Sequence, residues 1–277
     1  QVWRGSMAKF EGNLGTHLLL LLVAVIWGTT WAVARFLSYG LDESTGANLG
    51  PATAAWLRYL VVVIAFVAWC WAYRNRNGPR LLPHDSQSWR YTIWLGLLGT
   101  MAYQLLFMHG MKWTAAGDAS LIIPINPVFT VLLAAPMLGQ KVTRRMAFGL
   151  ILGIIGVSAV VGWSPNTDIP FEHRLLGDAM IVLAALAWAT NSNLTKIALG
   201  KEGMGTTEEL VIWYSIVGWV MLTPWMLVEI WSSGIPSPST TEWGSVAYLG
   251  LFSTVLTYVW FARGIDRIGP TAAASYV

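Results

Sequence analysis

Charged side chains and cysteines are both scarce in this sequence of 277 residues. Asp, Glu, Lys and Arg together make up 11% of the chain, whereas soluble globular proteins carry about 25%. The single cysteine, Cys70, excludes an intrachain disulfide and any metal site built from several cysteines. The four histidines form no H-x-x-x-H or H-E-x-x-H pair, so the sequence predicts neither a metal nor a cofactor. The formal net charge of +3 gives no support for nucleic-acid binding.

Apolar residues are correspondingly frequent. They account for 55% of the chain, with 17 tryptophans, and the mean hydropathy is +0.55. Because a bilayer is crossed by about 20 mostly apolar residues in a helix, we expect an all-α, polytopic membrane protein. Eight complete spans are predicted: His17–Phe36, Ala52–Ala72, Tyr91–Met111, Ala119–Leu138, Met146–Trp163, Gly177–Ile197, Leu210–Trp231 and Trp243–Ala262. A ninth span is predicted to open around Pro270.

The distribution of Lys and Arg predicts how the spans are oriented, because cytoplasmic loops of membrane proteins are enriched in both. With the N-terminus in the cytoplasm, 13 of the 17 Lys and Arg residues fall on the cytoplasmic side. Only Lys112 and Arg174 fall in outer loops. We therefore expect a multi-pass protein of the cell inner membrane with a cytoplasmic N-terminal tail at residues 1–16. Residues 1–6 are interpreted as a remnant of an expression tag.

Two parts of the sequence resemble each other. Six residues of the third span recur in the eighth span at a constant offset of 154, namely Leu95, Gly96, Leu97, Thr100, Phe107 and Gly110. Trp27 of the first span likewise matches Trp188 of the sixth span at an offset of 161. A repeat of five spans is odd, so the second copy must cross the membrane in the opposite sense, as in inverted-repeat transporters. We expect a first repeat at 17–163, an outer linker at 164–175 and a second repeat at 176–277, with most of helices 9 and 10 missing from this sequence.

Several motifs resemble those of one transporter family. They are Trp27-Gly28-Thr29-Thr30-Trp31 followed by Arg35, Trp56-Leu57-Arg58-Tyr59, Ala115-Ala116-Gly117-Asp118-Ala119-Ser120, Asn126-Pro127-Val128-Phe129 and Leu138-Gly139. In this order they resemble the drug/metabolite transporter superfamily, specifically its ten-helix EamA-type members. Gln140 departs from the pattern, since the family usually has Glu there. The resemblance implies a ten-helix, 5+5 basket around a central cavity, which moves amino acids, metabolites or drugs, often outward, by alternating access.

Tryptophan and amide side chains in the middle of spans are the first candidates for a substrate site. An indole N–H far from the membrane surface needs a polar partner or a hydrated cavity, which makes Trp27 and Trp188 candidates for cavity lining. Asn126 stands between Pro124 and Pro127, where the helix is expected to break and to expose backbone carbonyls. The alternatives are tight helix packing for the tryptophans and local bonding to the broken backbone for Asn126.

Further candidates come from polar groups near the centres of other spans. Tyr103 and Gln104 lie in the third span, Asn191 lies three residues after Trp188, and Tyr258 lies in the eighth span. For these the alternative is a hydrogen bond between helices. The predicted substrate-binding residues are Trp188, Asn126, Tyr103, Trp27, Asn191, Gln104 and Tyr258.

Two other features have a preferred structural interpretation. Arg58 and Arg35 could contact an anionic substrate, but we favour side chains that reach out to the outer headgroups or cap helix ends. Gly149, Gly153 and Gly156 follow small-x-x-x-small spacing and predict a helix-packing face.

The function predicted from all of this is transport, not enzyme catalysis. We expect a carrier for small, partly apolar metabolites, above all amino acids or related compounds, working by alternating access and moving them outward. Asp118, Asp178 and Glu229 fall near predicted span ends, which favours facilitated diffusion or exchange over proton coupling. The alternatives are a nucleotide-sugar carrier of the same superfamily and a polytopic membrane enzyme or receptor. The predicted partners are a small-molecule substrate and the lipid bilayer, and no oligomeric state is indicated.

Overall fold

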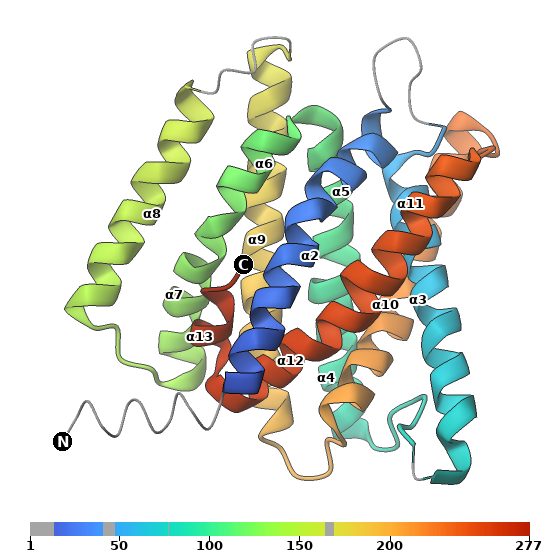
Figure 1. Cartoon of the computed structure of the whole chain (residues 1–277), viewed down its shortest axis with the longest axis vertical. Coiled ribbons are helices and arrows are strands. Elements are labelled where there is room, and N and C mark those ends of the chain that lie inside the picture. Colours follow the sequence, from blue (N-terminus) through green and yellow to red (C-terminus); the bar gives the residue numbers. More distant parts are fainter. Residues whose placement is uncertain (1–13, 41–47, 77, 164–168) are drawn as a thin grey trace.

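The computed structural model describes residues 14–40, 48–76, 78–163 and 169–277 (Figure 1). Residues 1–13 of the predicted tail (1–16) and residues 164–168 of the predicted linker (164–175) lie outside the described residues. The described part of the chain is helical and contains no strand. Eight of its helical units are long and apolar enough to cross a membrane. This confirms an all-α, polytopic membrane protein.

Each of the eight units contains one predicted span, and most of the units are a few residues longer than that span. The units are α2 (Leu14–Tyr39), α3 (Pro51–Tyr73), α4 to α5 (Ser86–Trp113), α6 to α7 (Ala116–Leu138), α8 (Arg144–Trp163), α9 (Phe171–Leu199), α10 (Thr207–Ser233) and α11 to α12 (Thr240–Ile268). A short helix, α13 (Pro270–Ala274), begins where the ninth span was predicted to open. Long extensions occur at the start of α9, where charged first turns follow Pro170, and at the end of α12.

Three of the units are interrupted within their length. The third consists of α4 (Ser86–Leu95), a π-helical segment η2 (Gly96–Ala102) and α5 (Tyr103–Trp113). The eighth consists of α11 (Thr240–Gly250), a π-helical segment η4 (Leu251–Leu256) and α12 (Thr257–Ile268). The fourth consists of α6 (Ala116–Ile122), a 3₁₀ turn η3 (Ile123–Ile125) and α7 (Asn126–Leu138). The break predicted between Pro124 and Pro127 is therefore confirmed.

The two π segments occupy matching places in the sequence. The 154-residue offset carries Gly96 to Gly250 and Ala102 to Leu256, so η2 falls on η4 with a difference of one residue at the start. The same offset carries the helix cap Asp85, before α4, to the helix cap Ser239, before α11. π-Helical segments are rare and often mark functional positions. The correspondence therefore extends from the residues to the local backbone.

Helix α9 lies in the centre of the bundle and α8 at its edge (Figure 1). In α9 56% of the most apolar 18-residue stretch is buried, whereas in α8 only 6% of the corresponding stretch is buried. A side chain added at Gly149 or Gly156 of α8 would meet no other atom within 4 Å, and only Gly153 faces a neighbour, Val128. The predicted packing face of three glycines is thus wrong for Gly149 and Gly156, because these two residues do not face the helices that α8 contacts.

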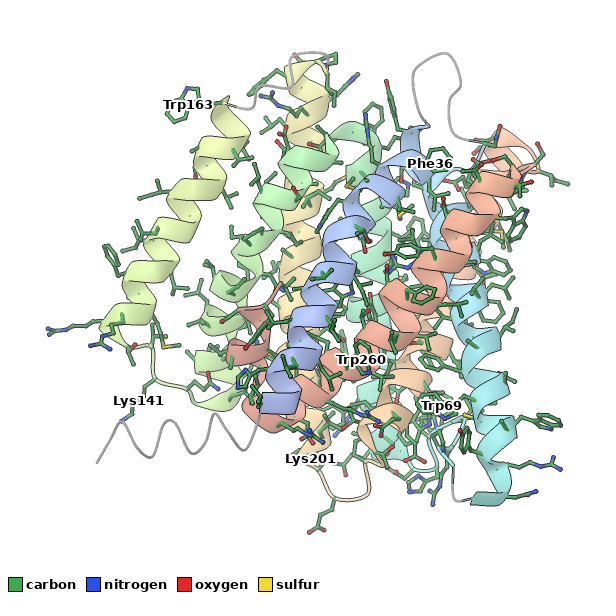
Figure 2. The ribbon with its side chains drawn as sticks, viewed as in Figure 1. Phe36, Trp69, Lys141, Trp163, Lys201 and Trp260 are labelled. Atoms are coloured by element: carbon green, nitrogen blue, oxygen red, sulfur yellow. The ribbon has the colours of Figure 1, made fainter. Side chains whose placement is uncertain are left out.

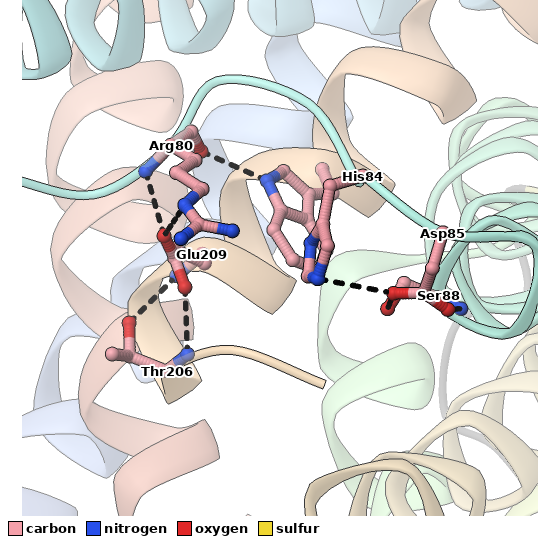
Figure 3. Close-up of polar contacts among 7 residues, drawn as sticks. Arg80, His84, Asp85, Ser88, Thr206 and Glu209 are labelled. Carbon is pink, nitrogen blue, oxygen red and sulfur yellow. Dashed lines mark hydrogen bonds and ion pairs between the residues drawn. The ribbon is translucent and has the colours of Figure 1, made fainter. Parts of the chain in front are cut away.

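Two lysines from different loops lie near the same end of the bundle. Figure 2 shows Lys141 and Lys201 near one end, while Phe36 and Trp163 lie near the other. At the lysine end Glu209 accepts backbone N–H groups of Thr206, at 2.9 Å, and of Arg80, at 2.8 Å (Figure 3). The loop before α4 is thereby tied to the first turn of α10.

The N-terminus of α4 is capped in the same region. Asp85 accepts the backbone N–H of Ser88 at 2.9 Å and its hydroxyl at 2.6 Å. These hydrogen bonds from Ser88 hold the pKa of the Asp85 carboxyl below its usual range. At the opposite end Glu229 of α10 accepts the backbone N–H groups of Ala52 and Thr53 at the start of α3. Carboxylates at helix N-termini are favourable because they meet unpaired N–H groups there.

We expect Gly218→Ala to destabilise the protein, because a methyl group at this position of α10 would overlap the buried side chain of Thr100 in η2. The cost of such overpacking is about 1–3 kcal/mol. Gly156→Ala is the matched control, since its surroundings are open and Ala favours a helix over Gly by up to about 1 kcal/mol. Thermal unfolding in detergent, followed by size-exclusion chromatography, measures both. A melting temperature for Gly218→Ala equal to that of the parent would contradict this packing.

Candidate functional site

A cavity of about 420 Å³ lies between the central helices. Segments far apart in the sequence contribute to it, from α2 through α3, α5, α6, η3, α9 and α12 to the end of the chain. The lining residues are Ala24, Trp27, Gly28, Thr30, Trp31, Arg58, Tyr103, Phe107, Ser120, Ile123, Pro124, Trp188, Tyr258, Tyr276 and Val277. Seven of these fifteen residues are aromatic, and the described lining also has a few hydroxyl groups and one charged side chain.

Four of the predicted residues form an aromatic cluster along this lining: Trp27, Tyr103, Trp188 and Tyr258. Trp188 of α9 is the centre of the cluster. Its ring centroid lies 5.5 Å from that of Trp27, 5.1 Å from that of Tyr103 and 4.9 Å from that of Tyr258. The ring planes of Trp27 and Trp188 are inclined at 81°, the edge-to-face arrangement that aromatic quadrupoles prefer. The structure therefore brings together side chains from α2, α5, α9 and α12.

Residues at equivalent positions of the two predicted repeats contact each other in this region. Trp27 and Trp188, related by the 161-residue offset, are the edge-to-face pair. Gln104 and Tyr258, related by the 154-residue offset, are joined by a hydrogen bond of 3.4 Å from the Gln104 amide to the Tyr258 hydroxyl. Residues near a two-fold axis meet their own equivalents across it. These contacts support an approximate two-fold axis through the aromatic cluster.

The two tryptophan N–H groups differ in their partners. The Trp27 indole donates to the Thr257 hydroxyl at 2.8 Å and to the Ser253 carbonyl at 3.2 Å. The Trp188 indole nitrogen is buried and has no hydrogen-bond partner among the described residues. A donor buried without a partner is unfavourable in apolar surroundings unless a ligand or water can reach it. Trp188 thus has an unused polar group next to the cavity.

Arg58 of α3 is the one charged side chain among the described lining residues. It is 3% exposed, so it does not reach out to the headgroup region as the sequence led us to favour. Its guanidinium donates to the Thr254 hydroxyl at 2.9 Å, to the Gln104 side-chain oxygen at 3.3 Å and to the Ser253 carbonyl at 3.3 Å. The other arginine, Arg35, caps a helix end as favoured, because it donates to the carbonyls of Met111 and Lys112.

The remaining three predicted residues do not line the cavity. Gln104 is fully buried one layer behind it, between Arg58 and Tyr258. Asn126 starts α7 after the 3₁₀ turn, where its side-chain oxygen accepts the Thr130 hydroxyl and its amide nitrogen has no partner among the described residues. The amide of Asn191 packs against Gly99 of η2, where an added Cβ would lie 2.5 Å from its oxygen. Each of the three remains a prediction as a substrate contact.

Two lining residues, Trp31 and Phe107, were not among the residues predicted to bind substrate. Trp31 lies four residues after Trp27, and Phe107 lies four residues after Tyr103, so each pair shares one helix face. The Phe107 ring is stacked on the Tyr103 ring with centroids 5.7 Å apart. Both could therefore have been predicted from their helical spacing. For Arg58 an anion contact was one of two interpretations, and the sequence could not decide between them, because a position near the outer end of a predicted span is equally typical of a lipid-facing arginine.

The described lining contains few side chains of the types that usually act as acids, bases or metal ligands. No Asp, Glu, Cys or His side chain is among the described lining residues. Across the described ranges, no group of three or more His, Cys, Asp or Glu side chains is placed to hold a metal ion. Ser192, the serine nearest to Trp188 in sequence, donates its hydroxyl to the Trp188 carbonyl within the same helix.

Comparisons with known proteins agree with this architecture. A family model described as the EamA-like transporter family matches residues 14–162 and 175–277. A solved crystal structure aligns with a TM-score of 0.64 at 18% identity, covering 95% of this chain and 84% of the other. That likeness concerns the fold alone.

Curated relatives are similar over most of their length. A protein of Streptantibioticus cattleyicolor named "Probable terminal-alkyne amino-acid exporter" is 29% identical, covering 92% of this chain and 78% of the relative. An "Uncharacterized transporter" of Archaeoglobus fulgidus is 28% identical, with 96% and 85% covered. A "Probable amino-acid metabolite efflux pump" of Escherichia coli is 26% identical, with 88% and 76% covered.

Thr257→Val tests the bond that holds Trp27 at the cavity wall. The substitution keeps the shape of the side chain but removes the hydroxyl that accepts the indole N–H, so we expect a loss of about 1–2 kcal/mol in stability. The matched control is Thr190→Val, because the Thr190 hydroxyl donates to the Leu186 carbonyl of its own helix and to no other described residue. Thermal unfolding of both variants gives the comparison. Equal melting temperatures for the two would mean that the Trp27 bond contributes little.

Proposed function

The chain belongs to the EamA-like transporter family, and on this basis we propose that it carries small, partly apolar metabolites across the membrane through the cavity described above. The substrates that we propose are amino acids or related compounds. The observation that carries the proposal is the aromatic cluster, which lines the cavity where residues of the two predicted repeats meet.

The cavity has a size and lining that suit such substrates. Its volume of about 420 Å³ lies within the range of about 300–1,000 Å³ for small-molecule pockets. Aromatic faces make van der Waals contact with varied apolar side chains, and they also attract an ammonium group. The hydroxyls of Thr30, Ser120, Tyr103 and Tyr258 can orient the polar end of the substrate. A nucleotide sugar fits less well, since its two phosphates would meet one cationic side chain among the described lining residues.

The proposed mechanism is alternating access between two inverted repeats. The paired π segments, the contact between Trp27 and Trp188, and the hydrogen bond between Gln104 and Tyr258 support a relation between the halves. In transporters of this architecture the substrate lies where the repeats meet, and one repeat rocks against the other. Because no carboxylate side chain is among the described lining residues, we propose facilitated diffusion or exchange.

We propose further that transport is outward, across the cell inner membrane, with the N-terminus in the cytoplasm. Two of the relatives carry names that describe amino-acid export or amino-acid metabolite efflux. Lys141 and Lys201 lie toward the same end of the bundle (Figure 2), and Lys and Arg are enriched in cytoplasmic loops.

Counterflow in proteoliposomes tests the transport proposal. We expect vesicles loaded with L-phenylalanine or L-leucine to accumulate the labelled compound, and Trp188→Ala to reduce the initial rate by about tenfold or more, because several ring contacts are lost together. Trp163→Ala is the control, since Trp163 is 84% exposed at the end of α8. Absence of counterflow for the whole amino-acid panel would reject the proposed substrates. Equal rates for the two variants would reject the assignment of Trp188.

Labelling of single cysteines tests the orientation. In a Cys70→Ser background, we expect Ser237→Cys, in the exposed loop between α10 and α11, to react in intact cells with a membrane-impermeant maleimide. Lys201→Cys, in the exposed loop between α9 and α10, should react only after the membrane is permeabilised. The reverse pattern would place the N-terminus outside.

A further inference from the structure

Arg58 places a permanent positive charge inside the membrane-spanning bundle without a described negative partner. No salt bridge of Arg58 occurs within the described part of the chain, and its three hydrogen bonds go to a hydroxyl, an amide oxygen and a backbone carbonyl. A buried charge that is not balanced by an opposite charge is strongly unfavourable. An ionisable residue in this position therefore suggests a function that needs the charge.

A purely structural role does not account for the choice of arginine. The three hydrogen bonds connect α3 to α5 and to η4, but neutral side chains could make such connections without the cost of burying a charge. The guanidinium also has more N–H groups than these bonds use, because each terminal nitrogen carries two and donates one here. Spare N–H groups on a cavity wall are available to a ligand.

We infer that Arg58 binds the carboxylate of the transported substrate, and that substrates are therefore carboxylates with an apolar body. This inference rests on the proposed function and specifies its substrate class. A guanidinium and a carboxylate match each other in shape and charge, and the pair is stronger than a bond between neutral groups. Bound there, the substrate would reach the rings of Tyr103, Trp188 and Tyr258, which line the same cavity. Amines without a carboxylate would be repelled by the same charge.

The surroundings hold Arg58 in a defined position for this role. Thr254 accepts from its Nε and in turn donates to the Leu249 carbonyl at 2.9 Å. The carbonyl of Ser253, which accepts from Arg58, also accepts from the Trp27 indole at 3.2 Å. The π segment η4 thus fixes the charged group and one wall of the aromatic cluster together. A preorganised charge of this kind binds its partner with less loss of side-chain freedom.

Binding to the parent protein gives the first test, and it needs no substitution. The probes are 3-phenylpropionate and its neutral amide, 3-phenylpropionamide, which have nearly the same shape. We expect the acid to bind about 10- to 100-fold more tightly, measured by quenching of tryptophan fluorescence and by the rise in melting temperature. Equal binding of the acid and the amide, or no binding of the acid, would overturn the inference.

Variants assign the preference to one side chain. In Arg58→Gln we expect the acid-to-amide ratio to fall to about one, whereas Arg58→Lys should retain part of it because the charge remains. Arg35→Gln is the control, since Arg35 is bonded to the carbonyls of Met111 and Lys112 and does not line the cavity. An unchanged ratio in a folded Arg58→Gln protein would overturn the inference. If that variant does not fold, equal binding of the acid and the amide by the parent protein would still overturn the inference.

The transport assay separates this inference from the proposed function. Counterflow of L-phenylalanine without a preference for the acid in binding would leave the proposed function in place and remove the role of Arg58. A preference for the acid that depends on Arg58, without counterflow of any amino acid, would support a carboxylate site and reject amino acids as the substrates.

Discussion

Polar groups in the middle of a membrane-spanning bundle have to find partners within the protein, and the π segment η4 supplies several of them here. Its Ser253 carbonyl accepts from both Arg58 and Trp27, and its Thr254 hydroxyl accepts from Arg58. Thr257, which follows directly, accepts from Trp27. In lipid an unpaired polar group costs several kcal/mol. These bonds allow an arginine and an indole N–H to be buried at the cavity wall.

The π segment η4 also affects which side chains reach the site. Because η4 interrupts a span of 29 residues, α11 and α12 present their side chains differently from a continuous α-helix. Tyr258 comes two residues after the segment and meets both Trp188 and Gln104. The matching segment η2 precedes Tyr103 directly, and Tyr103 also contacts Trp188. Two irregular segments at equivalent positions thus deliver two tyrosines to the same tryptophan.

The structure combines a tightly packed central helix with an open cavity beside it. The central helix α9 is tightly packed, with Gly177 so close to α5 that an added Cβ would lie 2.7 Å from the backbone of Thr114. A cavity lies beside α9. It is lined by large aromatic side chains that leave part of the space between the helices empty. A preformed cavity between packed helices suits a carrier, since the substrate then binds without the loss of side-chain freedom that ordering the site would require.

Much of the fold and part of the site followed from the sequence alone. The length and hydropathy of the apolar runs determined eight spans, since a bilayer requires about 20 apolar residues in each. The repeat offsets picked out Trp27 and Trp188, and the prolines around Asn126 predicted the broken helix at η3. Arg58 could not be assigned in this way, because a one-dimensional pattern does not show whether an arginine faces lipid, headgroups or a cavity. Only the packing of α3 against η4 and α5 decided that, by giving its guanidinium three acceptors inside the bundle.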